Sequence, residues 1–454
     1  MSTYHIRTFG CQMNEYDSHK MGALLRSRGY EPALSEDVAD VIVINTCSVR
    51  DKSYQKALSA IGRMRKSQKK KAFPSTIAVA GCVVSHEGEA IRKRFPFIDI
   101  LLGPDHVGEL PDLVAKARKN GSPVTALDFK DLSDYEFPEI LTSLPSAHSS
   151  SDRRPVKAYV TVMKGCDNVC SFCIVPFVRG GEVSRPVDDV IREILALEKE
   201  GVREVTLLGQ NVNSYGKALS VSFVELLRRV DRETHVDRVR FTSPHPKDLS
   251  PELIEEYRTN TKLCPHMHLP VQSGSNRILK AMRRAYTREV FLKKVDRLKQ
   301  VRPDVAITTD IIVGFPGETE KDFDATLSLV REAEFDASYS FAFSPRPLTE
   351  AARLVDDVPR DVKMERLYRL KDLQSEIGLR RNQTRLGVVE PVLVESSSRS
   401  ADSSDGGGAL YQLMGRTPHG RVVHFNSDRD RTGDILDVAI QEATITSLKG
   451  TLCK

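Results

Sequence analysis

The sequence predicts an α/β protein of three parts, and three patterns in the chain support this prediction. Short apolar segments alternate with helix-like segments over residues 1–145, which is typical of a parallel α/β domain. The alternation returns over residues 155–385, with enough strands for a partial (β/α)6 barrel. Over residues 386–454 strand-like segments follow one another with little helical periodicity, so we expect a small β-barrel there.

Ten apolar segments are predicted as strands of the first two parts. The amino-terminal ones are His5–Phe9, Val41–Asn45, Ile77–Ala80 and Ile98–Leu102. The central ones are Tyr159–Met163, Val205–Leu208, Val239–Thr242, His266–Val271, Ala306–Val313 and Ser338–Phe343. Between the two parts Ser143–Arg154 is too polar to pack, and we expect it to be a linker.

The carboxy-terminal part has its own strand pattern. Its predicted strands are Val388–Val394, Leu410–Met414, Val422–Phe425 and Ile435–Ala439. Inside it the low-complexity segment Ser396–Gly408 is too polar to fold by itself, and we expect a loop.

Length and composition narrow the class of protein. A chain of 454 residues exceeds what one hydrophobic core usually supports. No apolar run is long enough to cross a bilayer, and the first residues lack the pattern of a secretory signal, so we expect a soluble, cytoplasmic protein with no membrane partner. The net charge of +5 is too small to indicate a nucleic-acid partner unless the basic residues cluster.

The strongest motif is a group of three cysteines, Cys166, Cys170 and Cys173, in the sequence GCDNVCSFC directly after the first central strand. Eight cysteines in so long a chain are too few for a disulfide framework, and grouped cysteines in a reducing cytosol more often bind metal. Structural zinc takes four protein ligands, and no fourth one with finger-like spacing follows. Three thiolates instead leave one iron of a [4Fe–4S] cluster open to an external ligand.

A second group is formed by Cys11, Cys47 and Cys82, which are far apart in the sequence. Each follows a predicted strand, in RTFGC, VINTC and VAGC. Because the carboxyl ends of parallel strands lie on one edge of a sheet, these cysteines should converge on a second three-thiolate site. The alternative is three ordinary buried cysteines.

The GCDNVCSFC segment resembles the radical S-adenosylmethionine (SAM) superfamily. The resemblance implies that the open iron binds the amino and carboxylate groups of SAM, and that reductive cleavage of SAM gives a 5′-deoxyadenosyl radical. It also implies that Phe172 lies beside the adenine of SAM.

Essentially the whole chain is similar to the radical SAM methylthiotransferases, in particular to the branch that modifies isopentenyladenosine in tRNA. The motifs concerned are TFGCQMNEYDS, NTCSVRDK, GCDNVCSFCIVPFVRGGEVSR, LLGQNVNSYG, HLPVQSGSNRILKAMRRAYT, TDIIVGFPGETEKDF and SPRPLTEAA. The resemblance implies two [4Fe–4S] clusters, with the auxiliary one at Cys11, Cys47 and Cys82 carrying the sulfur. The expected reaction places a methylthio group on carbon 2 of the adenosine at tRNA position 37. Its partners would be the tRNA anticodon stem-loop, a reducing electron donor and a sulfur source.

Polar residues at the ends of the central strands are the expected SAM contacts, with loop capping as the alternative. They are Gln210, Asn211, Ser243, Gln272, Ser273 and Asp310. Gln272 is the expected ribose ligand. Where the superfamily usually has Gly-Gly-Glu after the second strand, this chain has Gly-Gln-Asn, and Leu348 stands where relatives usually have glycine. Glu182 and Arg185 are expected either to pair beneath the cluster loop or to be solvated.

The carboxy-terminal segment LMGRTPHGRVVHF resembles the TRAM domain, an OB-like tRNA-binding module. Arg416 and Arg421 flank its turn and are the expected RNA contacts. The basic run Arg63–Lys71 is either a second RNA contact or a solvated helix end.

Other functions stay open at this point. Within the same chemistry the substrate could be threonylcarbamoyl-adenosine in tRNA or an aspartate of a ribosomal protein. From other classes, the chain could be a non-catalytic iron–sulfur RNA-binding protein or a zinc-binding structural protein. Cleavage of SAM to 5′-deoxyadenosine separates an enzyme from the former, and iron content separates both from the latter.

Overall fold

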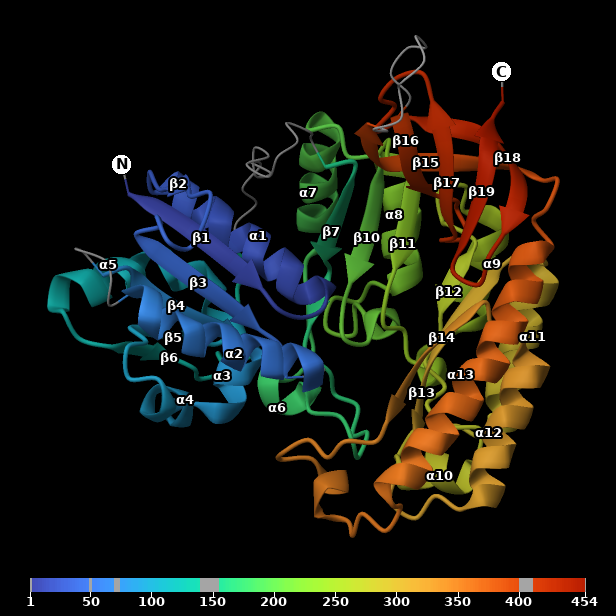
Figure 1. Cartoon of the computed structure of the whole chain (residues 1–454), viewed down its shortest axis with the longest axis horizontal. Helices are drawn as coiled ribbons and strands as arrows, with labels where there is room; N and C mark the ends of the chain where they lie inside the picture. The colour runs from blue at the N-terminus through green and yellow to red at the C-terminus, as the bar shows by residue number, and fades with distance from the viewer. Residues whose placement is uncertain (1, 49–50, 69–73, 139–154, 400–410, 454) are drawn as a thin grey trace.

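A computed structural model describes residues 2–48, 51–68, 74–138, 155–399 and 411–453 (Figure 1). The predicted linker Ser143–Arg154, most of the predicted loop Ser396–Gly408 and the end of the basic run Arg63–Lys71 lie outside the described residues. Within the described ranges, no helix combines the length and the apolar content needed to span a membrane.

The amino-terminal domain is a fully parallel sheet with the order β2-β1-β3-β4-β5-β6. Its strands are β1 (Thr3–Thr8), β2 (Glu31–Pro32), β3 (Val41–Thr46), β4 (Thr76–Gly81), β5 (Ile100–Leu102) and β6 (Val124–Ala126). Its helices are α1 (Gln12–Ser27), α2 (Asp51–Gln68), α3 (Cys82–Glu87), α4 (Glu89–Arg94), the 3₁₀ helix η1 (Pro104–Glu109) and α5 (Leu110–Asn120). Helices cover both faces, so β3 is apolar on both: Val41 and Val43 join one core, and Ile42 and Ile44 the other.

The central domain has six parallel strands in two three-stranded sheets, β11-β10-β7 and β12-β13-β14. The strands are β7 (Lys157–Thr161), β10 (Glu204–Leu208), β11 (Arg238–Phe241), β12 (His266–His268), β13 (Ala306–Val313) and β14 (Ala337–Ala342). A bridge between Val239 and Leu263 links the halves, and a short hairpin, β8 (Met163–Lys164) with β9 (Val183–Ser184), follows β7. Together the halves form the partial barrel that the sequence predicted.

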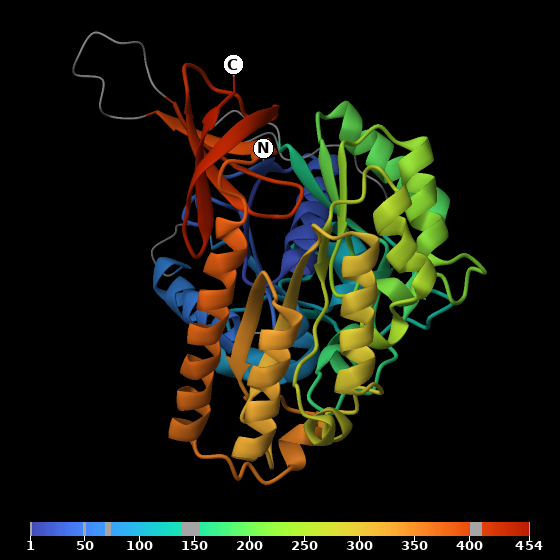
Figure 2. The ribbon, with the colours of Figure 1, turned by 90° about the vertical axis from the view of Figure 1, so that its right-hand side faces the viewer.

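Helices cover the outer side of this partial barrel (Figures 1 and 2). They are α7 (Val187–Lys199), α8 (Phe223–Glu233), α9 (Pro251–Thr259), α11 (Arg288–Val301), α12 (Glu320–Ala333) and α13 (Arg360–Gln383). The short helix α6 (Val175–Arg179) instead packs against α3 of the first domain, and α10 (Asn276–Ala281) packs in a separate apolar cluster. Three 3₁₀ helices lie in the loops: η2 (Val212–Ser214), η3 (Pro246–Asp248) and η4 (Glu350–Arg353). One large apolar core joins the strands to α7, α8, α9, α11, α12 and α13.

The carboxy-terminal domain is a closed barrel with the order β15-β16-β17-β19-β18, and this prediction is also confirmed. The strands are β15 (Val389–Arg399), β16 (Tyr411–Arg416), β17 (Val422–Ser427), β18 (Ile435–Ala443) and β19 (Ser447–Leu452). Two arginines of β11 bind the barrel: Arg238 donates to the carbonyl of Arg416 at 2.7 Å, and Arg240 to that of Thr417 at 3.0 Å. The barrel is therefore held against the central domain by partly buried hydrogen bonds.

Candidate functional site

The sheet brings Cys11, Cys47 and Cys82 together. Cys11 precedes α1 just after β1, Cys47 follows β3, and Cys82 begins α3 directly after β4. These three strands are neighbours in the sheet, so their carboxyl ends coincide. A hydrogen bond with Cys47 lowers the pKa of the Cys11 thiol to about 6, although burial alone would raise it. The thiolate form, which metals bind, is thus favoured at Cys11.

Close backbone packing holds this edge in place. Gly81 has a φ of +94°, and a Cβ there would overlap the carbonyl oxygen of Thr46. The fully buried Asn14 donates to Asn45 Oδ1 at 2.9 Å and to the Thr46 carbonyl at 2.8 Å, which ties α1 to β3. The position of each cysteine is therefore fixed by its neighbours in the sheet.

Cys166, Cys170 and Cys173 lie on the loop between β8 and α6. Asn168 Nδ2 donates to the Cys166 sulfur at 3.5 Å, and Arg284 Nη1 to the Cys170 sulfur at 3.3 Å. Burial, with a smaller contribution from the Cys170 and Cys166 thiolates, raises the pKa of the Cys173 thiol to about 12. The three thiols thus lie close enough together to interact electrostatically.

Side chains after β10 have polar atoms with no partner in the part of the chain that the structure describes. Gln210 Oε1 accepts the Gly165 N–H, but Gln210 Nε2 is buried and unpaired. Asn211 Nδ2 donates to Asp248 Oδ2 at 2.9 Å, while Asn211 Oδ1 is buried and unpaired. A buried donor and a buried acceptor without partners are costly unless a ligand pairs with them.

Two other expected SAM contacts have left-handed backbones although they are not glycine. The φ of Ser243 is 61° and that of Gln272 is 72°. Such strain is concentrated at functional sites. Gln272 accepts a backbone hydrogen bond from Ile312 at 2.9 Å, so its loop is fixed to β13.

The remaining expected SAM contacts have partners inside the protein. Ser273 is fully buried, and its hydroxyl accepts the Ser275 N–H at 3.2 Å, which matches the loop alternative. Asp310 Oδ2 lies 3.4 Å from His268 Nε2. Phe172 packs in an apolar cluster that includes Ile312 and Phe343.

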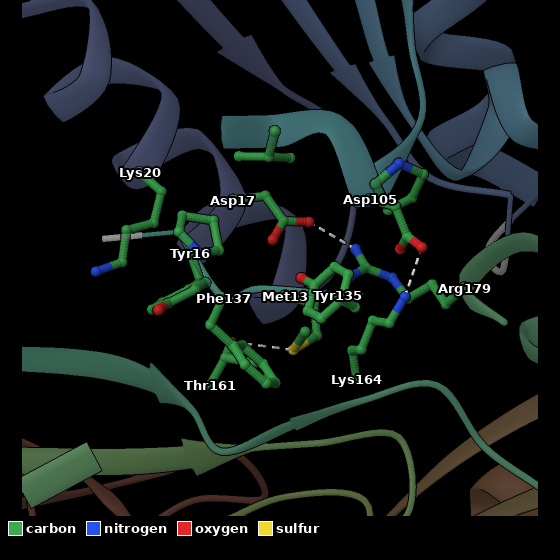
Figure 3. A pocket seen from close by; sticks show the side chains of 13 residues that line it. Met13, Tyr16, Asp17, Lys20, Asp105, Tyr135, Phe137, Thr161, Lys164 and Arg179 are labelled. Carbon is green, nitrogen blue, oxygen red and sulfur yellow. Dashed lines mark hydrogen bonds and ion pairs between the residues drawn. The ribbon is translucent and has the colours of Figure 1, made fainter. Parts of the chain in front are cut away.

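The helix α6 connects the two cysteine groups. It begins two residues after Cys173, and Ile174, which precedes it, and Val178 within it pack against Cys82. At its end Arg179 forms an ion pair with Asp17 of α1 at 2.7 Å (Figure 3). Burial raises the pKa of Cys82, and the charge and hydrogen bond of Arg179 oppose that rise. Arg179 and Asp17 were not expected from the sequence, because they come from different domains.

A small cavity lies at the interface between the first two domains, which we call the seam (Figure 3). Lys164 Nζ pairs there with Asp105 Oδ2 at 2.6 Å and lies 3.8 Å from the centre of the Tyr135 ring. Lys164 thus binds both Asp105 and the Tyr135 ring, while Asp105 Oδ1 is buried without a partner among the described residues. The lysine–aspartate pair joins the two domains.

The expected ion pair between Glu182 and Arg185 is wrong. Glu182 pairs with Lys217 at 2.8 Å. Arg185 is buried and pairs with Glu193, which also binds Lys20 at 2.9 Å. Lys20 belongs to α1, so this buried group also joins the first domain to the second.

The two expected RNA contacts have different surroundings. The side chain of Arg416 is 39% exposed and pairs with Glu395 at 3.2 Å. Arg421 is only 9% exposed, pairs with Asp336 and donates to Asn382 Oδ1 at 3.1 Å. Burial lowers the pKa of Arg421. The structure thus corrects the expectation for Arg421, whose charge is used to attach the barrel to the central domain.

Comparisons with known proteins agree with this arrangement. The radical SAM superfamily matches residues 160–330, and the uncharacterized protein family UPF0004 matches residues 3–103. A protein of Syntrophobacter fumaroxidans named tRNA-2-methylthio-N(6)-dimethylallyladenosine synthase is 45% identical over 99% of this chain and 95% of its own length. A protein of the same name from Anaeromyxobacter dehalogenans is 47% identical over 99% and 94%.

A solved structure shares the fold. It is the radical S-adenosylmethionine methyltransferase TsrM from Kitasatospora setae, with cobalamin and a [4Fe–4S] cluster bound. The TM-score is 0.57 at 14% identity, over 89% of this chain and 78% of that one.

Proposed function

This chain belongs to the family of tRNA-2-methylthio-N(6)-dimethylallyladenosine synthases, and we propose that it places a methylthio group on carbon 2 of that adenosine in tRNA. N(6)-dimethylallyladenosine is the isopentenyladenosine of the sequence prediction, and position 37, beside the anticodon, is the proposed site. The observation that carries the proposal is a pair of three-cysteine groups connected through α6, which follows Cys173 and packs against Cys82, in a chain that matches these relatives over nearly its whole length.

The cysteines fit two [4Fe–4S] clusters. Each group offers three thiols, and the other two cysteines are elsewhere: Cys264 lies beside Arg240, and the backbone N–H of Cys453 donates to the Asp437 carbonyl in the barrel. Within the described ranges, no three Cys, His, Asp or Glu side chains are arranged to hold a single metal ion. A three-thiolate set suits a cluster with one open iron.

When bound, the cluster at Cys166, Cys170 and Cys173 with SAM supplies the radical that removes the hydrogen at carbon 2, and the auxiliary cluster supplies the sulfur. The chain's own residues then have binding and shielding roles. Gln210 Nε2 is a free donor suited to the carboxylate of SAM, and Asn211 Oδ1 is a free acceptor suited to its ammonium group. This pair would replace the Gly-Gly-Glu of the superfamily.

Other residues complete the proposed site. Ser243 and Gln272 supply strained backbone at the strand ends, and Phe172 covers the adenine of SAM. The apolar contact of Ile174 and Val178 with Cys82 shields the Cys82 side of the proposed auxiliary cluster from water.

The carboxy-terminal barrel is the proposed tRNA-binding domain, of the TRAM type. Arg416 is its proposed phosphate contact, since its guanidinium reaches the surface. The reaction also needs an electron donor for the radical step and a source of sulfur. A cytoplasmic location follows from a tRNA substrate.

Mass spectrometry of tRNA nucleosides from a strain that lacks this gene tests the proposal. N(6)-dimethylallyladenosine should accumulate, its 2-methylthio form should be absent, and the gene should restore it. If the strain instead lost 2-methylthio-threonylcarbamoyl-adenosine, or methylthio-aspartate in a ribosomal protein, the proposed substrate would be wrong. Purified protein that never forms 5′-deoxyadenosine from SAM when reduced would instead be a non-catalytic binding protein.

A further inference from the structure

Strand β14 exposes two large aromatic side chains. Its residues alternate between two faces, and α13 packs against the face that carries Ala342. On the opposite face Tyr339 is 55% exposed and Phe341 is 46% exposed. Rings of this size side by side on an open face commonly mark a binding surface.

The pairing of the strands extends this face across the sheet. Tyr339 lies opposite Asp310, and Phe341 lies opposite Ile312. On β12 His268 shares the face, with its Nδ1 3.0 Å from Thr308 Oγ1 and its ring 5.8 Å from the Tyr339 ring. Because α11, α12 and α13 cover the outer side of this sheet (Figure 2), these side chains lie on its inner side. The inner face therefore combines two rings with a His268–Asp310 pair.

One end of this face meets the cluster loop. Phe172, between Cys170 and Cys173, and Ile312, the strand neighbour of Phe341, pack against the same apolar cluster, which includes Phe343. This apolar cluster links the cluster loop to the end of the face that carries Phe341.

The other end of the face is closed by the carboxy-terminal barrel. Arg240 bonds to the carbonyl of Thr417, and a Cβ on Gly420 would lie 3.5 Å from His266 Cδ2. The barrel therefore covers the end of this face at which β12 begins.

We propose that Tyr339 stacks on the adenine of the substrate nucleoside and that Phe341 and Ile312 bind its dimethylallyl group. The inference rests on the proposed function and names the residues that select its substrate. Aromatic rings stack on unpaired bases, and a branched apolar substituent gains by burial against Phe341. Asp310 would repel the carboxylate of a threonylcarbamoyl group, so the face favours the uncharged substituent. Asp310 thereby becomes a substrate-side residue rather than a SAM contact.

The test measures binding of two anticodon stem-loop RNAs, one with N(6)-dimethylallyladenosine and one with plain adenosine. Full-length reconstituted protein is titrated against each fluorescent RNA. Wild type should prefer the modified RNA. Phe341→Ala should remove most of that preference, while Phe341→Leu should keep part of it. Tyr339→Ala should weaken binding of both RNAs about tenfold, as expected for loss of one stacked base.

Tyr368→Ala is the matched control, because Tyr368 is 58% exposed on α13, outside the barrel. Iron content and SAM cleavage should stay normal in every variant, which shows that it is folded. An unchanged preference in Phe341→Ala, or a wild type without any preference, overturns the proposal. The proposed function fails on a different result, the absence of methylthio product from the modified RNA.

Discussion

Cys166, Cys170 and Cys173 share one loop between β8 and α6, whereas Cys11, Cys47 and Cys82 come from three strands that are neighbours only in the folded sheet. The first group is set by sequence spacing and the second by topology. The first site therefore depends on local backbone geometry, and the second depends on the register of an entire sheet.

The electrostatic surroundings of the two groups also differ. The hydrogen bond with Cys47 lowers the pKa of Cys11 to about 6, whereas burial raises that of Cys173 to about 12. Arg179 acts on Cys82 in the group formed by Cys11, Cys47 and Cys82, whereas Arg284 donates a hydrogen bond to Cys170 in the loop group. The difference suits two clusters with two tasks.

The largest expected effects come from substituting one glycine next to each cysteine group, Gly165 and Gly81, by alanine. Gly165 has a φ of +75°, and a Cβ there would overlap the Gly181 carbonyl oxygen, as one at Gly81 would overlap Thr46. Gly165→Ala should lose about half of the iron and all SAM cleavage, since one of two clusters is lost. Gly81→Ala should lose the other half and keep cleavage.

Iron analysis and 5′-deoxyadenosine assays measure both outcomes. Gly201→Ala is the control, because Gly201 has a φ of +93° but open space around it. If the Gly165 and Gly81 variants lost SAM cleavage equally, the two cysteine groups would not have the separate tasks that we propose.

Arg179 should matter to the auxiliary group alone. Arg179→Met leaves the buried Asp17 without a partner, which costs about 3–5 kcal/mol of unfolding free energy. In a background that lacks Cys166, Cys170 and Cys173, the reduced protein should also show an altered electron paramagnetic resonance signal, partly restored in Arg179→Lys. Arg192→Met, which breaks an exposed pair, is the control. An unchanged spectrum would remove Arg179 from this role.

The stability of the protein should depend on pH through Glu193, which lies at the seam between the first two domains. Burial alone raises the pKa of Glu193, but Lys20 and Arg185 outweigh it, so the pKa lies below its usual value. The carboxylate therefore adds stability above its unfolded pKa, about 4.3, and loses it as the pH falls through the lower folded pKa. The melting temperature of Glu193→Gln should fall less steeply in acid than that of wild type. Parallel curves would contradict this.

The smallest effect separates two arginines of the barrel. Arg416→Ala should reduce the log–log salt slope of tRNA binding by about one unit, as for one lost phosphate contact. Arg421→Ala should instead lower the melting temperature, because Arg421 is buried against Asp336. If only Arg421→Ala changed the salt slope, the assignment of the two residues would be reversed.

The sequence predicted both cysteine groups for reasons that the fold makes clear. Periodicity located β1, β3 and β4, and each cysteine follows its strand. It did not predict the seam, because Arg179 and Asp17 pair across domains and no local pattern records such a contact. Proximity in sequence suggested Glu182 with Arg185, but Arg185 points into the buried seam.

The sequence also misplaced the end of one strand and missed another. β12 ends at His268, short of the prediction, and Pro270 has no N–H for a further ladder bond. β19 was missed because SLKGTL has few apolar residues, and only its pairing in the closed barrel makes it a strand.

The most direct test of the division of labour compares two triple alanine variants. The variant at Cys11, Cys47 and Cys82 should keep SAM cleavage to 5′-deoxyadenosine and lose all methylthio product. The variant at Cys166, Cys170 and Cys173 should lose both. Methylthio-adenosine formed at a normal rate by the first variant would show that the sulfur comes from elsewhere and would contradict the account.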